Sequence, residues 1–121
     1  MLNGRSSGIL LPVFSLPGPW GIGTLGEGAR RFVDFLAQAR QHTWQILPLV
    51  PPGSGDSPYM SPSAFAGNPW LLDLEDLARR GLLTAEELNA AQYPNPDRVD
   101  YAWLRETRPA LLRGAWRRDQ E

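Results

Sequence analysis

Two short apolar segments on either side of one amphipathic stretch constrain the fold of this chain more than any other feature. Residues 8–14 (GILLPVF) and 43–50 (TWQILPLV) are apolar runs of strand length. Between them, residues 24–41 place apolar side chains at helical spacing on one face. This order predicts a βαβ unit of an α/β protein, whose right-handed crossover gives a parallel sheet. The second strand is apolar enough for burial on both faces.

The predicted helices are placed by capping signals. Thr24 and Glu27 have the spacing of a capping box, which predicts that the first helix begins there. The apolar face of this helix holds five residues: Ala29, Phe32, Val33, Leu36 and Ala39. Thr84 and Glu87 repeat the capping-box spacing and predict a second helix near 85–92.

Two further helices are predicted in the second half. Asp73 can cap a short helix over 74–80 that Gly81 ends with a positive φ. A longer helix starts near Asp100, and Pro109 predicts a bend in it. Its expected buried face is Leu104, Leu111, Ala115 and Trp116.

Composition excludes several classes of function. The net charge is −1 without an acidic or basic block, so nothing indicates a nucleic-acid or membrane partner. The chain has no cysteine, which excludes disulfides, thiol catalysis and cysteine-based zinc sites. Residues 1–20 lack the pattern of a signal peptide, and no run approaches the roughly 20 apolar residues of a membrane span. We expect a cytoplasmic protein without a metal or cofactor.

The glycines of residues 21–26 (GIGTLG) spell the dinucleotide-binding pattern G-x-G-x-x-G ahead of a helix. Two observations oppose that interpretation. The segment SLPGPW separates Gly21 from the first strand, and the second strand ends in LPLVPP, where an acidic residue should hold the ribose. A tight turn followed by a helix start is the alternative, because glycines supply positive φ there.

Two features predict that the chain is part of a longer protein. Two parallel strands cannot form a covered sheet, which needs at least three or four. The last predicted helix runs to Glu121 without a stop signal.

The segment 55–70 (GDSPYMSPSAFAGNPW) has neither a strand nor a helix period and is predicted to be an ordered loop. Long loops inside compact domains are uncommon, and those that exist are usually functional.

Six motifs then occur in order, at near-fixed spacing, over residues 6–83: SLPGPWGIG, FVDFLA, WQILPL, GDSPY, SAFAGNP and LLDLEDL. Together they resemble the N-terminal part of the 4-α-glucanotransferases, the amylomaltase or disproportionating enzymes of the α-amylase superfamily. The resemblance implies an incomplete (β/α)₈ TIM barrel that begins within residues 1–83. Residues 84–121 would be a helical insertion. Barrels of this kind place the active site on the loops after the strands, where residues 51–70 lie.

The resemblance also implies a reaction. These enzymes transfer an α-1,4-glucan segment to the 4-hydroxyl of another glucan or glucose by a retaining double displacement. An aspartate attacks, a glutamic acid protonates the leaving oxygen, and a second aspartate stabilises the transition state. The two working carboxyl groups lie about 5–5.5 Å apart. In the family all three come from later strands, so we expect no catalytic residue in this chain. Asp73, Glu75 and Asp76 are interpreted as a helix cap and first turn.

Substrate binding is what the resemblance carries over to this chain. The tyrosine of DSPY stacks on the sugar at the cleavage site in the family, and that residue is Tyr59 here. A flat ring suits the CH face of a pyranose. Ser57 is a candidate for hydrogen bonds to glucan hydroxyls, and Asp56 for a sugar contact or a loop brace. The alternatives are a packed tyrosine and a simple Asp-Ser-Pro turn. Ser54 stands where family members often carry an aromatic residue, which questions an outer glucan site.

The second half of the loop is predicted to support the first. Phe65 and Ala66 are expected to plug the space under the loop, and Gly67 allows an unusual φ. Asn68 can bond its own backbone ahead of a proline. Trp70 either lines the cleft or packs. A glucan-binding module without chemistry remains the alternative function.

Overall fold

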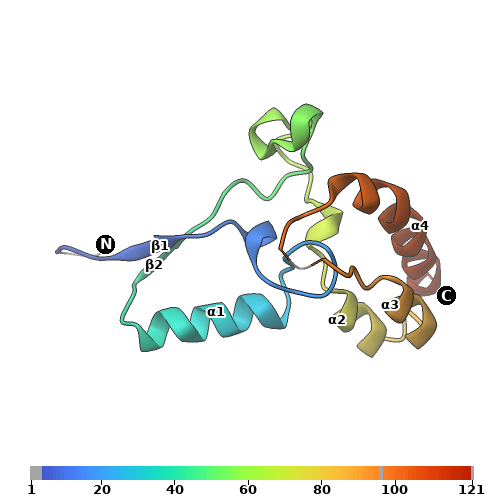
Figure 1. Cartoon of the computed structure of the whole chain (residues 1–121), viewed down its shortest axis with the longest axis horizontal. Coiled ribbons are helices and arrows are strands. Elements are labelled where there is room, and N and C mark those ends of the chain that lie inside the picture. The colour runs from blue at the N-terminus through green and yellow to red at the C-terminus, as the bar shows by residue number, and fades with distance from the viewer. Residues whose placement is uncertain (1–3, 96, 121) are drawn as a thin grey trace.

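The structure is a computed structural model that describes residues 4–95 and 97–120. A small parallel sheet and its crossover helix lie at one end, and three helices gather at the other (Figure 1). The strands and helices are β1 (Gly8–Leu10), α1 (Glu27–Gln38), β2 (Thr43–Gln45), α2 (Leu74–Arg79), α3 (Ala85–Ala90) and α4 (Tyr101–Asp119). Four 3₁₀ turns connect them: η1 (Val13–Ser15), η2 (Ser54–Asp56), η3 (Pro58–Met60) and η4 (Pro69–Leu71).

The predicted βαβ unit is confirmed. β1 and β2 pair in parallel, with Gly8 opposite Thr43 and Leu10 opposite Gln45, and α1 connects them. Both strands are shorter than predicted. Of the predicted strand over residues 8–14, only Gly8–Leu10 is β1. The strand ends before Pro12, which has no backbone donor, and the chain then forms η1.

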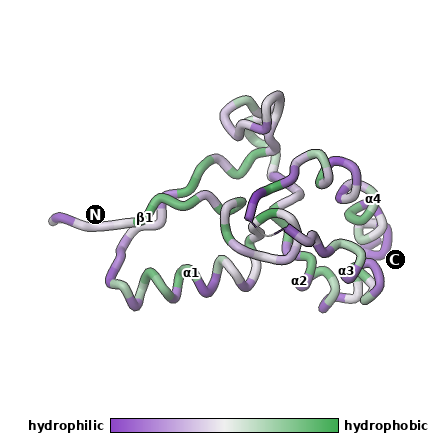
Figure 2. Tube along the Cα trace, viewed as in Figure 1, coloured by the Kyte–Doolittle hydropathy of each residue, from purple (hydrophilic) through white to green (hydrophobic). Residues whose placement is uncertain are grey.

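Burial of the second strand on both faces was a wrong prediction for this chain. Thr43 and Gln45 are exposed and Trp44 is half-buried. Among the described residues, α1 covers one face through Phe32, whose ring lies 5.0 Å from that of Trp44. Apolar residues nevertheless continue along the segment after β2 (Figure 2). The sheet therefore presents apolar surface that the described part of the chain leaves open.

The start of α1 differs from the prediction. The helix begins at Glu27 with Gly26 as its N-cap, so the predicted capping box of Thr24 and Glu27 does not form. The carboxyl group of Asp73 lies beside the start of the helix, since a Cβ on Gly26 would lie 2.4 Å from its Cγ. Asp73 precedes α2 as predicted but makes no side-chain capping bond there. Its charge instead lies at the positive end of α1.

The predicted apolar face of α1 is only partly buried. Ala29 and Leu36 are buried as predicted, but Val33 is 50% exposed and Ala39 is exposed.

Gly81 ends α2 with a φ of 76°, as predicted. α4 begins after Asp100, which accepts a hydrogen bond from the Trp103 N–H at 3.0 Å, and it continues through Pro109.

In the described part of the chain, the core consists of two hydrophobic clusters. The first joins η1, α1, η4 and α4 through Val13, Leu16, Ile22, Ala29, Leu71 and Leu104. The second joins the helical end through Trp20, Leu74, Leu83, Ala91 and Ala115. Leu104 and Ala115 are buried as predicted, and Leu111 is half-buried.

The buried face of α4 contains a cation that the pattern did not indicate. Arg108 is 2% exposed, donates to the Trp20 carbonyl at 2.5 Å and lies 5.7 Å over the Trp103 ring. Burial lowers its pKa to about 10. Trp116, predicted to be buried, is 63% exposed instead. The carbonyl and the aromatic ring together stabilise a charge that would otherwise be excluded from a core.

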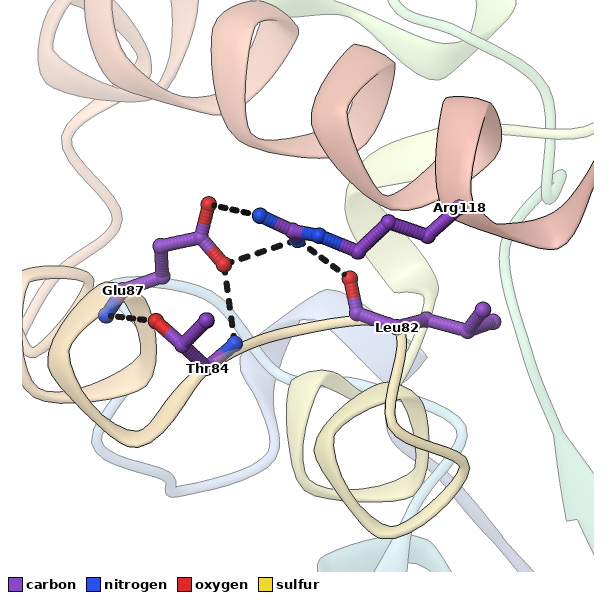
Figure 3. A network of polar contacts seen from close by, with 4 residues as sticks. All are labelled: Leu82, Thr84, Glu87 and Arg118. Carbon is purple, nitrogen blue, oxygen red and sulfur yellow. Dashed lines mark hydrogen bonds and ion pairs between the residues drawn. The ribbon is translucent and has the colours of Figure 1, made fainter. Parts of the chain in front are cut away.

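The predicted capping box of α3 is confirmed, and it extends into a network with α4 (Figure 3). Thr84 Oγ1 accepts from the Glu87 N–H at 3.1 Å, and the Glu87 carboxylate accepts from the Thr84 N–H at 2.8 Å. Arg118 donates to both Glu87 carboxylate oxygens at 2.8 Å and to the Leu82 carbonyl at 2.7 Å. This bidentate contact connects α3 to the end of α4.

The network predicts a pH dependence of stability. The Arg118 hydrogen bond and then the Thr84 backbone N–H lower the pKa of Glu87 from 4.5 to about 2. Because the pKa is lowered on folding, the stabilisation is present above about pH 4.5 and is lost as the pH falls toward 2. We expect Glu87→Gln to lower the melting temperature at pH 7, and the gap to wild type to narrow steadily as the pH falls from about 4.5 toward 2. Melts of both proteins over this range check it, and a gap that does not change with pH would contradict it.

Among the described residues, none of the helices combines the length and apolar content of a membrane span.

Candidate functional site

The loop after β2 stands away from the rest of the molecule (Figure 1). Its base is closed by a hydrogen bond of 3.0 Å from the Asn68 N–H to the Leu49 carbonyl. Between these residues the chain forms the turns η2 and η3 in succession. The two ends of the loop are therefore joined, and its tip projects at the carboxyl end of β2.

The tip contains two consecutive residues in the left-handed region. Gly55 has a φ of 71° and Asp56 a φ of 59°. Glycine adopts this conformation freely, and aspartate is among the few other residues that tolerate it. Gly53 is also required, because a Cβ there would lie 1.8 Å from the Met60 carbonyl oxygen. The backbone of the tip is thus fixed by residue types at particular positions.

The three predicted substrate residues lie together on this tip. Tyr59 is 71% exposed, while Ser57 and Asp56 are half-buried. Ser57 Oγ accepts from the Tyr59 N–H at 3.3 Å, which caps η3. Asp56 forms an ion pair with Arg105 of α4. The ring of Tyr59 is accessible, as stacking on a ligand requires, and the two polar residues make protein contacts around it.

The expected plug under the loop was a wrong prediction. Phe65 is 99% exposed and Ala66 is exposed. Ser63 Oγ accepts from the Phe65 and Ala66 N–H groups at 3.3 and 3.2 Å, which forms a local turn with the phenyl ring in solvent. Gly67 does not adopt a positive φ. Local serine bonds, rather than apolar packing, hold this half of the loop.

The end of the loop, Asn68 and Trp70, makes contacts within the protein that support the loop. Asn68 bonds its neighbouring backbone as predicted, because its Oδ1 accepts from the Trp70 N–H at 3.0 Å. Trp70 is half-buried, and its ring lies 5.9 Å from that of Tyr101 at 45°. Trp70 therefore packs against the start of α4.

In the glycine-rich segment before α1, protein atoms occupy the positions that side chains at Gly21, Gly23 and Gly26 would take. A Cβ on Gly23 would lie 2.1 Å from the Val13 carbonyl oxygen, and Gly21, with a φ of 74°, lies against Trp103. The Asp73 carboxyl group beside Gly26 places a negative charge at the start of α1. The glycines therefore serve close packing, which favours the tight-turn interpretation over nucleotide binding.

The acidic residues around α2 are engaged in ion pairs. Asp73 lies 3.7 Å from Arg79, and Asp76 lies 3.4 Å from Arg79 and 2.8 Å from Arg80. The contacts of Asp76 agree with its interpretation as part of the first turn of α2, whereas Asp73, interpreted as the cap, makes no side-chain capping bond there. Within residues 4–95 and 97–120, no three or more histidine or acidic side chains are grouped as metal ligands.

Comparison with known proteins decides the family. Residues 11–121 match the family described as 4-alpha-glucanotransferase. The chain belongs to the 4-α-glucanotransferase family. A 4-alpha-glucanotransferase of Synechocystis sp. is 56% identical over 102 residues, which are 84% of this chain and 20% of the relative. A 4-alpha-glucanotransferase of Thermus thermophilus is 50% identical over 113 residues, which are 93% of this chain and 22% of the relative.

A solved structure gives the same result. The amylomaltase from Streptococcus agalactiae, in complex with acarbose, superposes with a TM-score of 0.88 at 45% identity. The superposition covers 94% of this chain and 23% of that amylomaltase. The fold of this chain is therefore that of a portion of an amylomaltase. The chain spans about a fifth of the length of the curated 4-α-glucanotransferases that it matches.

One residue beside the site was missed at the sequence level. Arg105 pairs with Asp56 across 49 residues of sequence. It lies on the exposed side of a helix, where a charged residue carries no signal of its own. Only the fold brings the two side chains together.

Proposed function

We propose that this chain is the N-terminal part of an enzyme that transfers α-1,4-glucan segments to the 4-hydroxyl of an acceptor glucan or glucose. The match of residues 11–121 to the 4-α-glucanotransferase family carries the proposal. The acarbose complex of the similar amylomaltase supports a maltodextrin-type substrate. No cofactor is needed for such a transfer.

In this proposal, β1, α1 and β2 are the first unit of a (β/α)₈ barrel within residues 1–83, and residues 84–121 are a helical insertion. The parallel pairing of the strands and the open apolar surface of the sheet support it. The remaining strands would follow residue 121.

The proposed reaction is a retaining double displacement that uses a nucleophile and an acid about 5–5.5 Å apart. These carboxyl groups would come from later strands, so the chain alone would be inactive. Its own contribution would be binding: Tyr59 would stack on the sugar at the cleavage site, and Ser57 and Asp56 would contact glucan hydroxyls or brace the tip. The exposed ring of Tyr59 supports this role.

The test is to give maltotriose to the full-length protein that contains this chain. Formation of glucose together with longer maltodextrins is the expected result. Hydrolysis alone, or no reaction, would reject the transfer.

The second candidate is a glucan-binding module without chemistry, which the exposed rings of Tyr59 and Phe65 favour. Titration of maltoheptaose into the isolated chain, followed by tryptophan fluorescence, discriminates between the two. We expect little or no binding, because one loop supplies a single wall of a cleft. Saturation in the micromolar range would support the module instead.

A further inference from the structure

We propose that Arg105 of α4 is a positioning residue that holds the 56–59 turn in its glucan-binding conformation. The inference rests on the proposed function, because it assigns a role in substrate binding to a residue outside the loop. It also gives the helical segment 84–121 a part in the site.

The contact joins two distant parts of the chain. Arg105 Nη2 donates to Asp56 Oδ1. The two side chains are 48% and 34% exposed, so the pair lies at the surface and remains half-accessible. Arg105 stands one turn into α4, whose first turn is anchored by Asp100 and by the buried Leu104. The guanidinium group is thus held by a rigid helix.

The tip depends on such a contact. The hydrogen bonds described within it are local: Asp56 N–H to the Gly53 carbonyl at 3.3 Å, Tyr59 N–H to Ser57 Oγ at 3.3 Å and Met60 N–H to the Ser57 carbonyl at 3.1 Å. They shape the turn but do not orient it relative to the body. The Arg105–Asp56 pair is the described polar contact that connects the tip to a helix.

The pair acts on Tyr59 through the backbone. Asp56 adopts a left-handed φ of 59°, which aspartate tolerates but which still costs free energy relative to glycine, so contacts of its side chain help to hold it. Ser57 follows directly and caps the turn that carries Tyr59. If Asp56 is released, the turn samples other conformations, and the glucan must order it on binding. Arg105 would therefore raise affinity without touching the sugar.

The experiment uses the full-length enzyme with maltotriose. We expect Arg105→Ala to raise KM about two- to fivefold, the range that an exposed ion pair gives, with little change in kcat. Arg105→Lys keeps a cation and should recover part of the loss. Arg113→Ala is the matched control, because Arg113 is an exposed arginine on the same helix for which the described residues show no ion pair. A merely structural role would lower the melting temperature and leave KM unchanged.

A double-mutant cycle with Asp56→Asn tests the pairing itself, since asparagine tolerates the left-handed conformation but carries no charge. We expect Arg105→Ala to have no further effect on KM in the Asp56→Asn background. Simple addition of the two effects would overturn the proposal.

Hydrogen exchange separates this proposal from the proposed function. The backbone amides of Ser57, Tyr59 and Met60 should exchange faster in Arg105→Ala than in wild type and Arg113→Ala. If the wild-type enzyme does not transfer glucan, the proposed function fails, while the exchange still shows whether Arg105 holds the turn. Unchanged exchange would overturn the positioning role, whatever the activity.

Discussion

Replacement of Tyr59 by Ala in the full-length enzyme is expected to lower kcat/KM for maltotriose by about 10- to 100-fold. Contact between an aromatic ring and the CH face of a pyranose buries apolar area, and a fully buried side chain of this size contributes about 1.5–3 kcal/mol. The 71% exposure of Tyr59 leaves the ring available for this contact. Initial rates of glucose release over a range of maltotriose concentrations measure the effect.

Two controls separate stacking from other causes. Tyr59→Phe keeps the ring and should lose no more than about fivefold, the contribution of one hydrogen bond. Phe65→Ala removes a ring that is 99% exposed in the same loop and should stay within about twofold of wild type. Equal losses of kcat/KM in Tyr59→Ala and Phe65→Ala would show that the general apolar character of the loop determines activity. A specific stacking contact of Tyr59 would then be rejected.

The second large effect is on stability. Gly23→Ala should destabilise the protein by about 3 kcal/mol or more, because overpacking against fixed backbone forces the chain to shift. The new Cβ would lie 2.1 Å from the Val13 carbonyl oxygen and 2.7 Å from the Leu16 nitrogen. Val13 and Leu16 are 2% and 5% exposed, so neither segment can move without opening the first core cluster. Melting temperature and soluble yield of the full-length protein measure the change.

Gly67→Ala is the matched control, because a Cβ there meets nothing within 4 Å. It should leave stability unchanged or raise it by about 0.4–1 kcal/mol through the unfolded chain. A Gly23→Ala protein as stable as Gly67→Ala would mean that η1 is not packed against residue 23. It would also reopen the interpretation of GIGTLG as a ligand-binding segment.

The predictions that succeeded depend on local chemistry. The βαβ unit follows from apolar periods, and the Thr84–Glu87 capping box satisfies two backbone donors within one turn. The same spacing at Thr24 and Glu27 gave no capping box, because Gly26 and not Thr24 is the N-cap of α1. The Asp73 carboxyl group lies against Gly26, and the helix begins three residues after Thr24.

Burial on α4 could not be predicted from hydrophobicity. Arg108 is enclosed because the Trp20 carbonyl and the Trp103 ring accept its charge, while Trp116 turns to solvent on the same helix. In the loop, composition indicated a functional segment, and the family resemblance selected Tyr59. The partner of Asp56 lies 49 residues away and required the fold.

The hydrogen bonds of the loop have a consequence for how such a protein can change. Serines at 57, 61 and 63 bond groups no more than three residues away, and the Asn68–Leu49 bond closes the base. Apart from the Arg105–Asp56 pair, a segment built in this way keeps its described hydrogen bonds within itself. Its tip can gain, lose or exchange residues while the sheet and both core clusters stay as they are. Evolution, or a protein engineer, could alter what the tip recognises and leave the scaffold untouched.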